Sequence, residues 1–272
     1  MSPGYDPAES LGIAWLSACE EEKSLTAVEL LQAPDGFIDT GFLSPRWPSP
    51  IPELDSATHG GVYGVTALGG DAGSGKSMFA ASVALKTALR GERAVYVAAE
   101  MTKAQNLSRF GWLGAQWGYP AGRVIECLGH SLVVLEPEQR LGFEDFAMHI
   151  GRWLMGQTDA LLVVDSINSL LGHFADALGY WERFERLLGA MVETRKRSEG
   201  RLCALIISEL NQDGVSKGRR LEYAADLMLH MKQTPTPRVV KLKLVKNRER
   251  GSDGPLGEFR MTPQGLYERI DG

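Results

Sequence analysis

Apolar residues gather into short continuous runs that alternate with longer stretches of helical character. Val62–Leu68 is such a run, and the alanine-rich helical stretch Lys76–Arg90 follows it. The alternation continues through strand Ala94–Ala99 and helix Lys103–Trp117, strand Val124–Leu128 and helix Phe143–Gly156, strand Ala160–Val164 and helix Ala175–Arg197, and strand Leu202–Ser208. Strands that are apolar on both faces are typical of a parallel sheet buried between helices. The pattern predicts an α/β fold with a mostly parallel central sheet and helices on both faces.

The pattern changes after about residue 222, where strands follow one another directly. The expected strands are Asp226–Met231, Val239–Val245, Gly257–Met261 and Leu266–Glu268. Charged and apolar residues alternate in Lys241–Leu244, which indicates a strand with one face in water. We therefore expect an antiparallel C-terminal extension at the edge of the sheet.

The start of the chain differs from the rest in charge and proline content. Glu9–Glu22 and Ala27–Gln32 are candidate short helices, whereas the prolines between residues 34 and 52 prevent long regular structure. Residues 1–61 hold ten acidic and two basic residues, against 24 acidic and 27 basic residues in 62–272. We expect an acidic N-terminal arm or linker at 1–48 and one α/β domain at 49–272.

Composition excludes several classes of protein. A hydrophobic content of 44% supports a real core, and no apolar stretch approaches the roughly 18 residues that cross a bilayer. The first residues carry no basic segment followed by an apolar one, so we expect no secretion signal and no membrane partner. Cys19, Cys127 and Cys203 form no C-x-x-C pair, which favours the cytoplasm. A net charge of −5 argues against a dedicated non-specific DNA binder.

One segment carries a specific chemical signal, because GDAGSGKS fits the pattern GxxxxGK[ST] at every constrained position. Its members are Gly70, Asp71, Ala72, Gly73, Ser74, Gly75, Lys76 and Ser77. Glycines let backbone N–H groups turn toward phosphate oxygens, and the following helix N-terminus favours the same anion. We expect ATP as the bound nucleotide, with Lys76 at its β- and γ-phosphates and the Ser77 hydroxyl on Mg²⁺.

Two carboxylates end neighbouring strands where the phosphates are expected. Asp165 follows the run ALLVV, at the place for a carboxylate that orients Mg²⁺, and its alternative role is a helix N-cap. Glu100 ends the run AVYVAA and is placed to accept a proton from the attacking water. The alternative for Glu100 is a residue that only starts the helix at Lys103.

The basic segment Arg238–Arg250 includes Lys246-Asn247-Arg248 at the end of an expected strand. These cations could stabilise a γ-phosphate in the chain's own site or in a neighbour's site. They could also contact nucleic-acid phosphates, or form a solvated basic hairpin.

The glycine-rich segment Leu210–Arg220 joins two expected strands. Its basic residues Lys217, Arg219 and Arg220 suit contact with nucleic-acid phosphates, whereas the absence of an aromatic residue argues against base reading. The alternative is an ordinary exposed loop.

Taken in this order, the motif, Glu100, Asp165 and KNR resemble the RecA superfamily of ring-forming ATPases, in particular the ATPase core of RadA and DnaB-type helicases. The resemblance runs from about Ser49 to Glu268 and includes AAEMT, GRRLEYAADL and VKNRERGSDGPLGEFRM. It implies that Glu100 is the catalytic glutamate and that Lys246 and Arg248 act on the neighbour's nucleotide. It also implies a homo-oligomer, either a ring, expected to be a hexamer, or a filament, with ATP between subunits and single-stranded DNA or RNA as partner.

The chain departs from the family at the end of strand Leu202–Ser208. Glu209 stands where the family usually carries a glutamine or histidine that senses the γ-phosphate, so Asn211 or Gln212 is a candidate for that role. The spacing in KNRERG also differs from the usual one. The predicted function is a motor on single-stranded nucleic acid; the alternatives are an ATP-gated assembly switch whose protein partner binds the acidic arm, and a small-molecule kinase.

Overall fold

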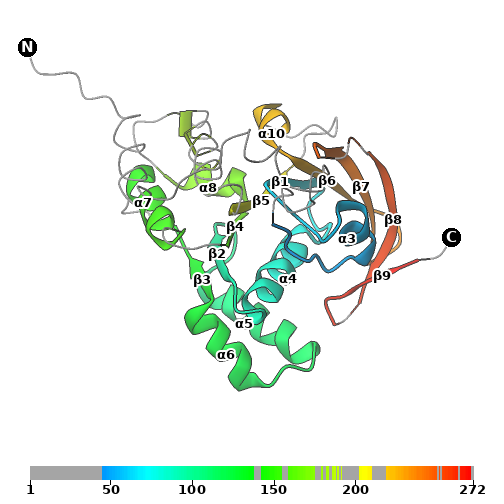
Figure 1. Cartoon of the computed structure of the whole chain (residues 1–272), viewed down its shortest axis with the longest axis horizontal. Helices are drawn as coiled ribbons and strands as arrows, with labels where there is room; N and C mark the ends of the chain where they lie inside the picture. Colours follow the sequence, from blue (N-terminus) through cyan, green and yellow to red (C-terminus); the bar gives the residue numbers. More distant parts are fainter. Residues whose placement is uncertain are drawn as a thin grey trace, which may run out of the picture.

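The computed structural model describes residues 45–270, apart from 138–141, 155–158, 192–201, 210–218, Arg250, Ser252, Pro263 and several positions within 175–190. In this part of the chain one nine-stranded sheet forms the centre of the molecule (Figure 1). Its strands are β1 Val65–Gly70, β2 Arg93–Ala98, β3 Leu132–Leu135, β4 Ala160–Asp165, β5 Leu202–Glu209, β6 Leu227–Gln233, β7 Val239–Asn247, β8 Gly254–Met261 and β9 Tyr267–Arg269.

The strand order is β3-β2-β4-β5-β1-β6-β7-β8-β9. Neighbours from β3 to β6 are parallel, and the pairs β6–β7, β7–β8 and β8–β9 are antiparallel. The expected parallel sheet with an antiparallel extension is therefore confirmed. Because β1 lies between β5 and β6, the loop that follows β1 emerges in the middle of the sheet.

Helices cover both faces of the sheet, and each face has its own apolar core. The described helices are α3 Pro52–Thr58, α4 Lys76–Leu89, α5 Lys103–Gln116, α6 Ala121–His130, α7 Phe143–Leu154, α8 Ile167–His173 and α10 Arg219–Ala224. One core joins α4, α5 and α6 to the sheet and includes Phe79, Tyr96 and Phe110. The other lies under α7, α8 and α10 and includes Phe146, Leu170 and Leu221. None of the described helices is long and apolar enough to cross a membrane.

The prediction of a strand at Val124–Leu128 is wrong, because this segment lies inside α6. Val124 and Cys127 are buried one helical turn apart, and Cys127 Sγ approaches the carbonyl oxygen of Ala88 at 3.5 Å. Val124 therefore faces α5 and Cys127 faces α4, while Ile125 between them is exposed. The strand of this unit is β3, which pairs with β2.

Other strand and helix boundaries differ from the predicted ones by a few residues. β1 begins at Val65 rather than Val62, because Val62 pairs instead with Trp47 in an isolated bridge. The described positions within 182–191 are helical, in agreement with part of the predicted helix Ala175–Arg197, but α8 was not predicted. The candidate helices Glu9–Glu22 and Ala27–Gln32 lie outside the described residues. The division into an arm at 1–48 and a domain at 49–272 stays a prediction, although buried Trp47 already packs on the domain.

Candidate functional site

The GDAGSGKS segment forms a turn between the end of β1 and the start of α4. Gly73 and Gly75 have φ values of 76° and 89°, a left-handed backbone region that favours glycine. A Cβ on Gly70 would lie 2.0 Å from the carbonyl oxygen of Met231, so the backbones of β1 and β6 approach too closely for any other residue. The buried Ser74 hydroxyl has no hydrogen-bond partner among the described residues. The loop thus forms a tight, glycine-rich turn, and it places the N-terminus of α4 at the end of the central strand.

Lys76 begins α4 and is almost fully buried, at 8% exposure. Its Nζ donates hydrogen bonds of 2.9 Å and 2.7 Å to the carbonyl oxygens of Gly70 and Asp71. Burial lowers the pKa of Lys76, and the carboxylates of Glu100, Glu209, Asp165 and Asp71 oppose that shift. The ammonium group is thus held against the backbone of the loop, and four carboxylates lie near enough to favour its charged form.

Asp165 and Ser77 meet beside the loop. Ser77 Oγ donates a 3.0 Å hydrogen bond to Asp165 Oδ1, and the buried Tyr96 hydroxyl donates to Asp165 Oδ2. Burial raises the pKa of Asp165, and the Tyr96 and Ser77 hydrogen bonds lower it. A hydroxyl oxygen and a carboxylate oxygen at hydrogen-bonding distance are the hard ligands that Mg²⁺ prefers, so these residues fit the expected metal. Ser166, rather than Asp165, accepts the hydrogen bond that caps α8.

Tyr96 was not predicted as a site residue. It lies in the middle of β2 and packs edge-to-face on Phe110 with ring centroids 5.4 Å apart, so the sequence marks it only as a core aromatic. Its register position, opposite Val163 in the strand that ends in Asp165, brings its hydroxyl to the carboxylate. Burial raises the pKa of Tyr96 well above its ordinary value, so the hydroxyl remains a donor.

Glu100 follows the end of β2 and lies exposed at the same sheet edge. The N–H of the preceding Ala99 donates to the carbonyl oxygen of Asp165 at 2.8 Å, which fixes Glu100 next to β4. Ser169 Oγ approaches Glu100 Oε1 at 3.4 Å. Helix α5 is capped by Thr102, whose hydroxyl accepts from the N–H of Gln105, so Glu100 is not the residue that starts this helix.

Glu209 ends β5, directly opposite Gly70 in the neighbouring strand. Its N–H donates a 3.0 Å hydrogen bond to Asn168 Oδ1 of α8. Glu209 therefore adds a further carboxylate to the edge that carries Asp165 and Glu100. Asn211 and Gln212, the other candidate sensor residues, lie outside the described part of the chain.

Lys246 and Arg248 lie toward the opposite end of the strands from the loop. Gly70 pairs with Met231 at the loop end of β6, whereas Lys246 pairs with Met228 near the other end. At about 3.3 Å per residue, Lys246 lies three residues, roughly 10 Å, from the level of Gly70 along the strands. Arg248, whose N–H donates to the carbonyl oxygen of Asp226, lies five residues, roughly 16 Å, from it. The register, together with the hydrogen bonds of Lys246 to Glu222 and of Arg248 to Tyr223, places the two cations away from the chain's own site. It is compatible with a role in a neighbour's site, with contact to nucleic-acid phosphates and with a solvated basic hairpin.

The predicted nucleic-acid residues fall at the margin of the described chain. Lys217 lies outside it. Arg219 and Arg220 are the first two residues of α10, and the structure does not describe their side chains. Their role stays a prediction.

The C-terminal hairpin contributes a residue that was not predicted. Tyr267 Oη in β9 donates a 3.0 Å hydrogen bond to the carbonyl oxygen of Gly75, the residue that precedes α4. The Tyr267 ring also packs edge-to-face on Phe79 at 6.4 Å. No local sequence signal marks this contact, because it joins residues 192 positions apart.

Comparisons with known proteins agree with this geometry. A model of the KaiC ATPase family matches residues 47–267. DNA repair protein RadA of Brucella abortus (strain 2308) is 31% identical over 230 residues, which cover 83% of this chain and 45% of that protein. The chain thus spans a little under half the length of this relative.

Solved structures also share the fold. A KaiC-like protein from Pyrococcus horikoshii OT3 has a TM-score of 0.65 at 21% identity, over 83% of this chain and 99% of that chain. A DnaB-like replicative helicase has a TM-score of 0.65 at 14% identity, over 92% of this chain and 68% of that chain. With the loop, Lys76 and Asp165 in place, the chain belongs to the KaiC ATPase family of RecA-superfamily P-loop ATPases.

Proposed function

We propose that this chain is the ATPase unit of a ring or filament in which each ATP site is completed by an adjacent copy, and that the assembly moves along single-stranded nucleic acid. The observation that carries the proposal is the strand register. It places Lys246 three residues and Arg248 five residues from the level of Gly70, toward the end of the strands away from the chain's own P-loop. In a head-to-tail assembly, a second copy would bring its Lys246 and Arg248 to the P-loop of the first copy.

The residues of the loop edge have complementary roles in this proposal. The loop and Lys76 would hold the phosphates, and Ser77 with Asp165 would hold Mg²⁺, which supplies positive charge against the oxygens of the transferring phosphoryl group when bound. Glu100 would orient the attacking water and accept its proton. Lys246 and Arg248 of the adjacent copy would stabilise negative charge that develops in the transition state.

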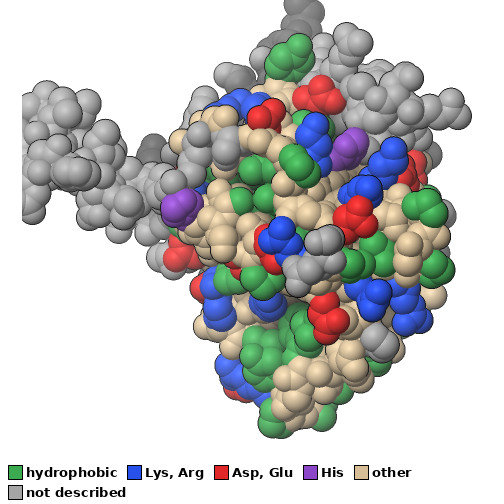
Figure 2. Space-filling model, turned by 90° about the vertical axis from the view of Figure 1, so that its right-hand side faces the viewer, with side chains coloured by type: hydrophobic (Ala, Val, Ile, Leu, Met, Phe, Trp, Pro, Cys, Tyr) green, Lys and Arg blue, Asp and Glu red, His purple; other side chains and the backbone are tan. Residues whose placement is uncertain are grey.

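Single-stranded nucleic acid is proposed as the partner from two supports. The RadA relative is named a DNA repair protein, and basic residues flank the segment that leads into α10. On the face that Figure 2 shows, Lys and Arg side chains are interspersed with Asp and Glu side chains. This face is therefore not a continuous basic field. The proposed contact with phosphates should be sensitive to salt.

The test is ATP hydrolysis with and without single-stranded DNA, measured over a range of protein concentrations. Turnover per chain that rises steeply with protein concentration supports a site shared between copies, and stimulation by the strand supports the motor. Turnover that is independent of concentration and complete in a monomer would contradict the shared site.

A second candidate function is an ATP-gated assembly switch that acts on a protein partner. The net charge of −5, with ten acidic residues among the first 61, favours it because a strand-binding motor is usually more basic. Clear basal turnover, dependence on protein concentration and no response to DNA or RNA would support the switch over the motor.

A further inference from the structure

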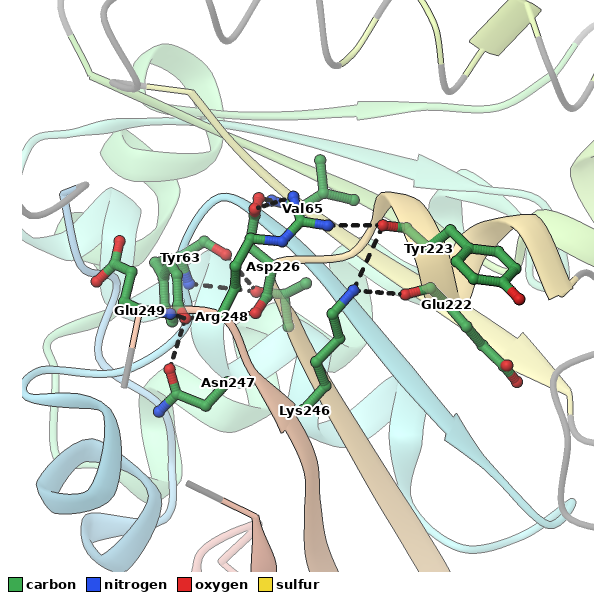
Figure 3. Close-up of polar contacts among 10 residues, drawn as sticks. Tyr63, Val65, Glu222, Tyr223, Asp226, Lys246, Asn247, Arg248 and Glu249 are labelled. Atoms are coloured by element: carbon green, nitrogen blue, oxygen red, sulfur yellow. Dashed lines mark hydrogen bonds and ion pairs between the residues drawn. The ribbon is translucent and has the colours of Figure 1, made fainter. Parts of the chain in front are cut away.

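The strand end that carries the two cations is held from both sides by its own chain. Along residues 246–249 the side chains alternate, with Lys246 and Arg248 toward α10 and Asn247 toward Tyr63 (Figure 3). On the α10 side, Lys246 Nζ donates a 2.7 Å hydrogen bond to the carbonyl oxygen of Glu222. Arg248 Nη2 donates a 2.7 Å hydrogen bond to that of Tyr223. These are C-terminal carbonyls of a helix, which favour cations.

On the opposite side, the hydroxyl of Tyr63 donates a 2.8 Å hydrogen bond to Asn247 Oδ1, and the N–H of Glu249 approaches the same hydroxyl at 3.4 Å. Arg46 stacks over the Tyr63 ring and pairs with Glu249. The backbone between Lys246 and Glu249 is therefore fixed in position, and the two cationic side chains are directed to one side of it.

Asp226 is the residue at which these contacts converge. It is only 4% exposed, and it lies between the start of β1 and Arg248. Its Oδ2 accepts a 2.9 Å hydrogen bond from the N–H of Val65, and its Oδ1 accepts from Arg248 Nη1 at 3.1 Å. Its carbonyl oxygen accepts the N–H of Arg248 at 2.8 Å. Charge-assisted hydrogen bonds of this kind are stronger than neutral ones and set side-chain direction.

We propose that Asp226 is a positioning residue that presents Arg248, together with Lys246, to the nucleotide of an adjacent copy. The inference rests on the proposed function, in which these cations complete the neighbour's site. The side chain of Arg248 is 53% exposed, so one part of the guanidinium is fixed while the rest is open to a partner. A cation ordered before assembly loses less conformational freedom when it meets its target, and it needs no reorganisation during the reaction.

Asp226→Asn tests the role selectively. The asparagine oxygen can still accept from Val65, while its NH2 group faces Arg248 and cannot accept from it. We expect kcat for ATP to fall about tenfold with little change in KM, because an interaction made only in the transition state has been weakened. The control is Glu258→Gln, which makes the same change in the exposed ion pair with Lys241 on the neighbouring strands and should leave turnover unchanged.

Mixing of subunits separates positioning from a merely structural role. A Lys76→Ala chain cannot turn over its own nucleotide but carries an intact Asp226–Arg248 pair. Added in excess to Asp226→Asn, it should restore most of the turnover, because it supplies the ordered cations to the intact P-loops of the other chains. The expected result for Arg248→Ala is the same loss of kcat and the same rescue.

Unchanged kcat in Asp226→Asn, or a loss that mixing does not rescue in a folded chain, would overturn the positioning role. If Asp226→Asn does not give a cooperative thermal transition, Asp226→Ser replaces it in the same mixing experiment with the same criteria. Full turnover in Arg248→Ala would instead refute the proposed function itself, since the cation would then be dispensable whatever holds it.

Discussion

The hydroxyl of Tyr267 is hydrogen-bonded to the carbonyl oxygen of Gly75 at 3.0 Å, so the last strand of the sheet is tied to the first turn of α4. The same carbonyl oxygen also accepts the N–H of Phe79 at 2.9 Å. Tyr267 is 5% exposed, and burial raises the pKa of its hydroxyl, which keeps it a donor. The C-terminal hairpin thereby becomes a support of the P-loop.

Tyr267→Phe should therefore weaken the loop without opening the core. We expect the free energy of unfolding to fall by about 1 kcal/mol, the usual net value of one hydrogen bond. The KM for ATP should rise a few-fold, with kcat little changed, because a less firmly held loop binds the nucleotide more weakly in the ground state and in the transition state alike. Denaturant unfolding and steady-state kinetics measure both, and Tyr119→Phe on the exposed end of the α5–α6 region is the matched control.

Glu100→Gln should lose turnover and keep nucleotide binding. The amide cannot accept the proton of the attacking water, so we expect kcat to fall by about 100-fold or more. Binding of ATP should be equal or tighter, because one negative charge near the triphosphate has been removed. Retained turnover in this variant would show that Glu100 is not the base.

The control for that experiment is Glu209→Gln, which removes a carboxylate from the same sheet edge and puts the residue usual for the resembled family at this position. We expect turnover to be retained or increased. Nucleotide binding should be equal or tighter in both variants, so kcat alone separates a chemical role from an electrostatic one.

Gly114→Ala should destabilise the packing of α5 on α6. A Cβ at this position would lie 2.4 Å from Val124 Cγ2, so one helix must shift, and overpacking of this kind costs about 1–3 kcal/mol. Gly111→Ala, in the same helix with nothing within 4 Å of the new Cβ, should instead stabilise by about 0.5–1 kcal/mol. Thermal unfolding of the two variants should shift in opposite directions.

His230 should lower the free energy of unfolding in mild acid. Burial lowers the pKa of His230 from its ordinary 6.5, the charges of Lys243 and Lys232 act in the same direction, and Asp71 opposes them. In the pH range between the folded pKa and 6.5 the unfolded chain binds more protons, so the free energy of unfolding falls as the pH is lowered through that range. Urea unfolding at about pH 7.5 and about pH 5.5 measures this, and His230→Gln should reduce the difference.

The parallel sheet, and the residues around the P-loop at the carboxyl ends of its strands, could be predicted from the sequence. Buried strands are recognisable from continuous apolar runs, and carboxylates at strand ends must share an edge with the P-loop in a parallel sheet. As this argument requires, Asp165 accepts a hydrogen bond from Ser77, and the negative charge of Glu100 raises the pKa of Lys76 against the effect of burial. The segment Val124–Leu128 was misassigned because a short apolar run has no period that separates a strand from a helix.

What the sequence alone determined about this protein is local: the GDAGSGKS loop, the strands around it and the carboxylates that end them, because each follows from neighbouring residues and their spacing. What only the tertiary structure decided depends on residues far apart in the chain. The register of β6 and β7 places Lys246 and Arg248 away from their own loop. Tyr96, Asp226 and Tyr267 find their hydrogen-bond partners in segments far away in the sequence. Such contacts are set by sheet order and side-chain reach, which leave no local pattern in the sequence.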